Sequence, residues 1–327
     1  MRVERLMPEP SYSDELLILV SRCYYIDNLP QAEIAKLVNV SQSSMSRMLS
    51  LARKRGLVRV SVPEYEPRYE ELEQELGSRF GIDAVVIRTA PGLKGGDLRA
   101  ALAFFAAPVA MKWIEPKSIV AVAGGRAMQA LIERLRPKAP DPSVSIVQAM
   151  GNIDSCPGAY DAVELGRLLA KRWNARFYTL NAPGILPDAE TCRQFLQLEQ
   201  IRLVTEQLRS ATTTFVGIGT LANSVFLERN VLAPEEIEVL RQARAVGEML
   251  GRFFDADGNE CDTDFRERVV SLPLSEVRNL PRVVAVVSGT DRADAVRSAM
   301  AAQLINTLVI DQAGAAAILG RTDTNAI

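Results

Sequence analysis

The chain has 327 residues, of which 48% are apolar and 24% are charged, and its formal net charge is −2. This length favours roughly two domains with enough apolar material for a substantial core. The sequence contains no histidine, and its four cysteines form no C-x-x-C pair, so the usual Ser-His-Asp and Cys-His nucleophiles are excluded. We expect no metal, no cofactor and a reducing cytoplasm. We also expect no membrane span and no export signal in residues 1–13.

Helical spacing of apolar residues predicts three helices near the N-terminus, at residues 12–27, 30–38 and 42–54. Ser41 is a good N-cap for the third helix, and Gly56 is a candidate for its left-handed C-cap. Residues 57–62 then alternate between apolar and polar types, which predicts a strand. Residues 1–62 are therefore predicted to form a winged helix-turn-helix, all-α with a β-wing.

The next segment, residues 63–81, is rich in Glu and Arg and has apolar residues at helical steps. Two interpretations fit it equally well. It is either a linker helix that also pairs between subunits or the first helix of the following domain.

Residues 82–327 alternate between short β-branched runs and helical stretches. This alternation predicts an α/β domain with a mostly parallel sheet that helices cover on both faces. The predicted strands are 84–88, 119–123, 143–148, 176–180, 213–218, 282–287 and 307–310. The predicted helices are 98–113, 126–136, 160–173, 192–209, 234–243, 291–302 and 312–319.

Residues 30–62 carry six Lys or Arg residues and one acidic residue, Glu33, which gives a local charge of +5. Local positive charge is what neutralisation of DNA phosphates requires. The start of the third predicted helix is polar, and a recognition helix presents its N-terminal side chains to base edges. A solvated helix in a small bundle is the plain alternative for this stretch alone. The candidate DNA-binding residues are Gln31, Ser41, Gln42, Ser43, Ser44, Ser46, Arg47 and Arg53.

The stretches 24–35, 40–49 and 52–58 together resemble the SorC/DeoR-type family of bacterial sugar-responsive transcriptional regulators. The stretches 247–258, 268–270 and 308–311 are also similar to family signatures, so the resemblance covers almost the whole chain. It implies an effector domain with the fold of sugar-phosphate isomerases and glucosamine-phosphate deaminases, used for binding. It also implies a homo-oligomer, either a dimer or a tetramer, that binds double-stranded operator DNA.

Residues 119–126 read as a strand that leads through two glycines into a helix. Such a junction suits a phosphate or a hydroxyl-rich ligand, although a Gly-Gly pair is often only a tight turn. The family usually has Gly-Trp-Gly-Arg-Thr here, whereas this chain has Ala123-Gly124-Gly125-Arg126-Ala127. Arg126 is kept but the hydroxyl is lost, so a sugar, a polyol and a sugar phosphate all remain open as the effector.

Ligands of open parallel sheets lie beyond the carboxyl ends of the strands. Strand ends and the family signatures therefore add further candidates to this loop. The full set of candidate effector-binding residues is Gly124, Gly125, Arg126, Ala127, Gln148, Gly217, Gly219, Asp255, Arg268, Gly289 and Arg292. Asp255 could equally cap a turn, and Arg268 could equally brace a loop. Asp161 and Glu164 are further, uncertain contacts.

The sequence thus predicts a DNA-binding regulator of a carbohydrate or polyol operon, controlled by a sugar-like effector. The alternative is a sugar-phosphate isomerase-like enzyme with an accessory DNA-binding domain. That chemistry needs a positioned general base, and no carboxylate lies in or beside the Gly124-Gly125 loop. A purely architectural DNA-binding oligomer is a third, weaker hypothesis.

Overall fold

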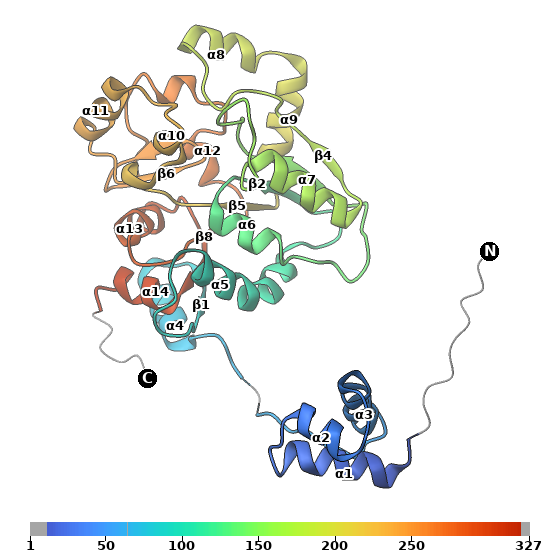
Figure 1. Ribbon diagram of the computed structural model, residues 1–327. Helices are drawn as coiled ribbons and strands as arrows, with labels where there is room; N and C mark the ends of the chain where they lie inside the picture. The colour runs from blue at the N-terminus through green and yellow to red at the C-terminus, as the bar shows by residue number, and fades with distance from the viewer. Residues whose placement is uncertain (1–11, 64, 322–327) are drawn as a thin grey trace, which may run out of the picture. The chain divides into compact units, whose positions relative to one another are not determined.

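The computed structural model describes residues 12–63 and 65–321, and the chain divides into two compact units, Met1–Glu66 and Pro67–Ile327 (Figure 1). The prediction about an export signal falls mostly on residues 1–11, which lie outside the described residues.

The first unit contains three helices, close to their predicted bounds: α1 (Asp14–Tyr25), α2 (Gln31–Leu37) and α3 (Gln42–Lys54). Ser13 caps α1 and Ser41 caps α3, because each hydroxyl accepts a hydrogen bond from a backbone N–H in the first turn. One face of each helix supplies the core of this unit. Its buried members include Leu17, Val20, Ile34, Met45, Met48 and Leu49.

The wing strand predicted at 57–62 is not formed. Residues 57–63 adopt no regular secondary structure, and Val60 and Val62 are 64% and 77% exposed. A strand needs a neighbour with which to exchange backbone hydrogen bonds. Residues 12–63 contain no second strand, so alternation alone produces an extended, unpaired segment.

The helix predicted over 63–81 begins later, as α4 (Glu70–Phe80). Leu72 and Leu76 are buried in the core of the second unit. Glu73 accepts hydrogen bonds from the backbone N–H of Val86 and from the Arg68 guanidinium. These contacts make α4 the first helix of the second unit.

The second unit is built on a seven-stranded, fully parallel sheet of order β1-β9-β8-β5-β2-β3-β4. This arrangement confirms the predicted parallel α/β fold. Six of the seven strands have at least three buried residues each, as expected for a sheet covered on both faces. The strands are β1 (Asp83–Ile87), β2 (Ile119–Val122), β3 (Ser145–Gln148), β4 (Arg176–Tyr178), β5 (Thr213–Val216), β8 (Val283–Val286) and β9 (Thr307–Asp311).

Alternate strand residues point into two separate cores, one on each face of the sheet. One core contains α5 (Gly95–Ala110), α6 (Arg126–Ile132) and α7 (Ala162–Trp173), and a 3-10 turn (Met111–Trp113) follows α5. The other contains α4, α9 (Glu199–Arg209), α13 (Ala293–Ala301) and α14 (Gln312–Ile318). Within the described residues, every helix is too short or too polar to cross a bilayer.

The single helix predicted at 192–209 is instead two, α8 (Ala189–Leu196) and α9. Leu198 between them has extended backbone angles, and Asp188 caps the start of α8. The sequence prediction also missed a small layer over one end of the sheet, with its own core around Phe226, Phe253 and Phe265. Its elements are α10 (Val225–Glu228), α11 (Pro234–Gln242), β6 (Gly247–Met249) and β7 (Arg252–Phe254), whereas α12 (Leu274–Val277) packs into the core that contains α4. Of these five elements, only α11 was predicted.

The order of the strands creates a switch point between β2 and β5. After β2 the chain continues outward to β3, whereas after β5 it continues in the opposite direction to β8. Loops that leave neighbouring strands in opposite directions open a crevice at the carboxyl ends of those strands.

Candidate functional site

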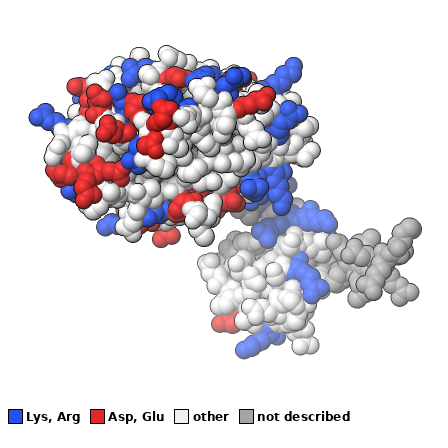
Figure 2. All heavy atoms as spheres, turned by 90° about the horizontal axis from the view of Figure 1, so that it is seen from above, with Lys and Arg blue, Asp and Glu red and all other residues white. Residues whose placement is uncertain are grey.

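Most of the candidate DNA-binding residues lie on the exposed face of α3, whereas Gln31 is the first residue of α2. Gln42, Ser43, Ser46, Arg47 and Arg53 are all exposed, and they lie opposite the buried positions of the same helix. Ser44 and Gln31 are partly buried. Figure 2 shows more Lys and Arg than Asp and Glu on the visible face of the smaller unit.

Three of the serines form a cap. Ser41 Oγ accepts from the backbone N–H of Ser44 at 3.1 Å, and it lies 2.9 Å from the hydroxyls of both Ser43 and Ser44. These hydroxyls therefore satisfy one another and the first turn of the helix. Gln42, Ser46 and Arg47 are left as the side chains best placed to reach outward.

The basic residues of this unit fall into two groups. Arg55 donates to Asp14 at 2.7 Å and to the carbonyl of Tyr12, so it ties the end of α3 to the start of α1. Arg47 and Arg53 form no ion pair among the described residues. Of these three arginines, Arg55 supports the fold, and only Arg47 and Arg53 have free guanidinium groups.

In the second unit, a pocket lies at the switch point of the sheet. Its floor is formed by the loops that follow β2, β5 and β8, and its roof comes from β6 and α10. The lining includes seven of the predicted residues: Gly124, Gly125, Arg126, Ala127, Gly217, Gly219 and Arg292.

Two glycines shape the loop after β2. Gly125 has φ +134°, which side chains rarely permit, and its N–H donates to the carbonyl of Tyr160 at 2.8 Å. A Cβ on Gly124 would lie 3.1 Å from the same carbonyl oxygen. The Gly-Gly pair thus lets this loop lie directly against the segment before α7.

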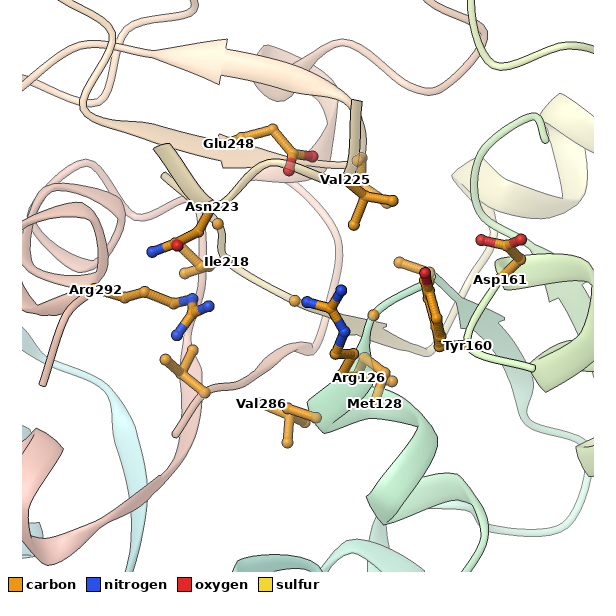
Figure 3. Close-up of a pocket in the computed structure, with 18 of the residues that line it drawn as sticks. Arg126, Met128, Tyr160, Asp161, Ile218, Asn223, Val225, Glu248, Val286 and Arg292 are labelled. Atoms are coloured by element: carbon orange, nitrogen blue, oxygen red, sulfur yellow. The ribbon is translucent and has the colours of Figure 1, made fainter. Parts of the chain in front are cut away.

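Three arginines converge on the pocket from three elements: Arg99 from α5, Arg126 from α6 and Arg292 from the start of α13. Arg126 and Arg292 point into the same space from opposite sides (Figure 3). Burial, followed by the charges of Arg126 and Arg292, lowers the pKa of Arg99. Arg126 pairs with Glu228, and Arg292 pairs with Asp291 at 2.9 Å. Arg99 has no carboxylate partner among the described residues, so the cluster retains positive charge.

Glu248 on β6 faces the arginines from the roof of the pocket (Figure 3). Its Oε1 accepts from the backbone N–H of Gly251 at 2.9 Å. A Cβ on Gly219 would lie 3.0 Å from Oε2, so any other residue at this position would press on the end of the carboxylate. Burial raises the pKa of Glu248 to about 7, against the lowering effect of the Gly251 hydrogen bond.

A buried polar cluster forms the side wall next to Tyr160. Two guanidinium groups contact the tyrosine ring, those of Arg126 at 5.3 Å and Arg229 at 5.0 Å from its centroid. Arg229 pairs with Asp161 at 2.8 Å and with Asp154 at 3.0 Å. Asp161 Oδ2 also accepts from Gly158, whereas the buried Oδ1 has no hydrogen-bond partner among the described residues. One carboxylate oxygen at the wall of the pocket thus remains unsatisfied.

This arrangement of a parallel sheet and a pocket at its switch point matches a known family. A family model described as "Putative sugar-binding domain" covers residues 68–320. The chain belongs to the SorC/DeoR-type family of sugar-binding transcriptional regulators. It is accordingly a sugar-responsive transcription regulator, as the sequence predicted.

Curated relatives of this SorC/DeoR-type chain match it over almost its full length. The deoxyribonucleoside regulator of Bacillus subtilis (strain 168) is 25% identical over 305 residues, which is 93% of this chain and 97% of that protein. The transcriptional regulator LsrR of Enterobacter sp. (strain 638) is 29% identical over 313 residues, which is 94% of this chain and 93% of that protein. Both relatives are regulators, so relatedness favours a regulator over an enzyme.

Solved structures of this family share the fold. The full-length sorbitol operon regulator SorC from Klebsiella pneumoniae has a TM-score of 0.71 at 23% identity, covering 94% of this chain and all of that one. A DeoR-family regulator from Listeria monocytogenes has a TM-score of 0.70 at 28% identity, covering 76% of this chain and 98% of that one.

Four residues predicted for the effector site of this SorC/DeoR-type chain do not line the pocket. Gln148 is fully buried and bonds to Met150, Asn152 and Leu180. The other three serve local structure. Asp255 accepts from Asp257 and Asn259 within its own turn, Arg268 braces a loop through Leu186 and Glu236, and Gly289 donates to Asp311. Glu164, an uncertain candidate, pairs with Arg167 on the face of α7.

Sequence reasoning missed Arg99, Tyr160, Asn223 and Glu248, all of which line the pocket. Glu248 lies within the 247–258 signature, in which Asp255 is the candidate that the sequence indicates. The wall residue Asp161, an uncertain candidate from the sequence, does line the pocket. Nothing local in the sequence distinguishes Arg99 from a charged residue at the start of an apolar helix.

Proposed function

We propose that this regulator binds operator DNA through α3 and that a sugar carrying an anionic group, such as a sugar phosphate, occupies the pocket and controls that binding. The observation that carries the proposal is the convergence of Arg99, Arg126 and Arg292, whose three charges are matched by two carboxylates, Glu228 and Asp291. An anion between these guanidinium groups would satisfy the excess charge through charge-assisted hydrogen bonds.

The wall of the pocket next to Tyr160 and the roof of the pocket offer hydrogen-bond acceptors. Asp161 Oδ1 is buried without a partner, and Glu248 faces the pocket from β6. Sugar hydroxyl groups donate hydrogen bonds, so they would satisfy these oxygens while the anionic group lies among the arginines. A neutral polyol would leave the arginine cluster without its counter-charge, and it is therefore the weaker candidate.

We propose that the regulator is a homo-oligomer, as the family resemblance implies, and that it catalyses no reaction. Catalysis would need a general base. The best candidate is Glu248, and it lies on β6 in the roof of the pocket, not in the Gly124-Gly125 loop. Turnover of a ketose or aldose phosphate by the purified protein would revive the enzyme hypothesis. The likeness of the effector fold to sugar-phosphate isomerases stays a prediction from the sequence.

A thermal-shift screen of sugars, each paired with its own phosphate, tests the ligand class. A ligand of the native state raises the melting temperature with concentration. We expect one sugar phosphate to stabilise the protein while its parent sugar has little effect. Arg99→Gln should abolish the difference, and Arg134→Gln, which lies outside the pocket on Phe104, should preserve it. Equal stabilisation by a sugar and its phosphate would overturn the anionic assignment.

A further inference from the structure

One face of α1 has no packing partner among residues 12–63. Ile18 and Leu19 are 52% and 46% exposed, and Ile26 at the end of the helix is 67% exposed. The core of the unit uses the opposite face, through Leu17 and Val20. Three large apolar side chains on a helix of this length form a stripe that water does not favour.

Two charged residues lie on the same stripe. At 100° per residue, Glu15, Ile18, Leu19, Arg22 and Ile26 fall within roughly 100° of the helix circumference. Glu15 and Arg22 are exposed and form no ion pair among the described residues. The neighbouring acid, Asp14, is already paired with Arg55.

The order of these residues is self-complementary. If a second α1 is laid antiparallel, with a two-fold axis between Ile18 and Leu19, then each Ile18 faces the Leu19 of the other copy. The same register places each Glu15 opposite an Arg22. Each contact then occurs twice, once on either side of the two-fold axis. An interface that uses the same surface of both copies in this way is isologous.

We infer that the stripe Glu15-Ile18-Leu19-Arg22-Ile26 is a docking surface for α1 of a second copy of this chain. One helix face is much smaller than a standard interface of about 1,200 Å² or more, so this contact is weak alone. It becomes effective when the remainder of the chain raises the local concentration of the first unit. Pairing through α1 would present two α3 helices to the two half-sites of an operator. This consequence rests on the proposed function.

Cross-linking of the full chain tests the pairing without DNA or ligand. In a Cys156→Ser background, which removes the exposed native cysteine, Ile18→Cys places a thiol next to the axis. Packed helices lie 8–10 Å apart, within reach of a short bismaleimide. We expect a cross-linked dimer from Ile18→Cys, and much less from Ser50→Cys on the exposed face of α3.

Charge exchange provides the matched controls. In the Ile18→Cys background, Glu15→Arg and Arg22→Glu should each lower the yield by about threefold, since each creates two like-charge contacts. The double variant Glu15→Arg/Arg22→Glu should restore the yield, and so should a mixture of the two single variants. The inference is overturned if Ser50→Cys cross-links as well as Ile18→Cys, or if the double variant is no better than the singles. Failure of this test leaves the effector pocket and operator binding untouched.

Discussion

Arg229 and Asp161 form an ion pair of 2.8 Å in which the side chains are only 13% and 4% exposed. Arg229 is held on its other side by the ring of Tyr160. Burial lowers the pKa of Arg229, but its hydrogen bonds to Asp161 and Tyr160 outweigh that effect and raise the pKa overall. This pair fixes the wall of the pocket against the start of α7.

Breaking the pair should be costly, most of all when Asp161 is left buried without its counter-charge. We expect Arg229→Gln to lower the free energy of unfolding by about 3 kcal/mol, and Asp161→Asn to lower it by less, because Arg229 keeps its ion pair with Asp154. The double variant should lose clearly less than the sum of the two, because its members share one interaction. Urea unfolding of the wild type, the two single variants and the double variant completes this double-mutant cycle. Additive losses would show that the two residues act independently.

Glu248 should make the stability of the second unit depend on pH. Its pKa is raised to about 7 by burial, above the usual value for an unfolded glutamate, so the native state holds the proton more tightly. The stabilisation is fully present below the unfolded pKa and is lost as pH rises through about 7. Glu248→Gln should therefore match the wild type at pH 4 and exceed it by about 3 kcal/mol at pH 8.

Unfolding in urea at the two pH values measures this difference. Glu238→Gln, on the exposed face of α11, is the control and should show no such change with pH. If Glu248→Gln gains nothing at pH 8, the carboxylate is better solvated than its position in the pocket indicates.

The two free arginines of α3 should affect DNA binding differently. Arg47→Ala should weaken binding to the specific site by about tenfold to a hundredfold, with a smaller effect on unrelated DNA, if Arg47 reads a base. Arg53→Ala should weaken both equally and reduce the slope of log affinity against log salt by about 1, as for a lost phosphate contact.

Fluorescence anisotropy at several salt concentrations separates these two roles. Arg202→Ala, an exposed residue of α9, should leave both affinities unchanged. Equal losses of specific and unrelated binding in Arg47→Ala would place Arg47 on the backbone instead of the bases.

The sequence was most informative where local signals decide structure. The bounds of α3 follow from the period of Met45, Met48 and Leu49 together with the cap at Ser41. The parallel sheet follows from β-branched runs of four to six residues separated by helices. The loop of Gly124 and Gly125 was also among the candidates, although a Gly-Gly pair is often only a tight turn and the family resemblance was needed to support it.

The errors arose where pairing or packing at a distance decides. The alternation at 57–62 is typical of a strand, but the unit offers no neighbour to pair with. Strands β6 and β7 have three residues each, too few for a periodic signal, so Glu248 was missed with them. Arg99 lies near Arg126 and Arg292 only after three helices have packed on the sheet. No spacing in the sequence predicts that these three residues come together.

The central claim, that occupancy of the pocket controls DNA binding, is tested most directly by operator affinity with and without the stabilising ligand. Footprinting on DNA next to the protein's own gene first identifies the site. We expect the ligand to change the affinity of the full chain for this site by about fivefold or more. Arg99→Gln should remove that change while the affinity without ligand stays the same. An affinity that is identical with and without saturating ligand would show that the pocket does not control DNA binding.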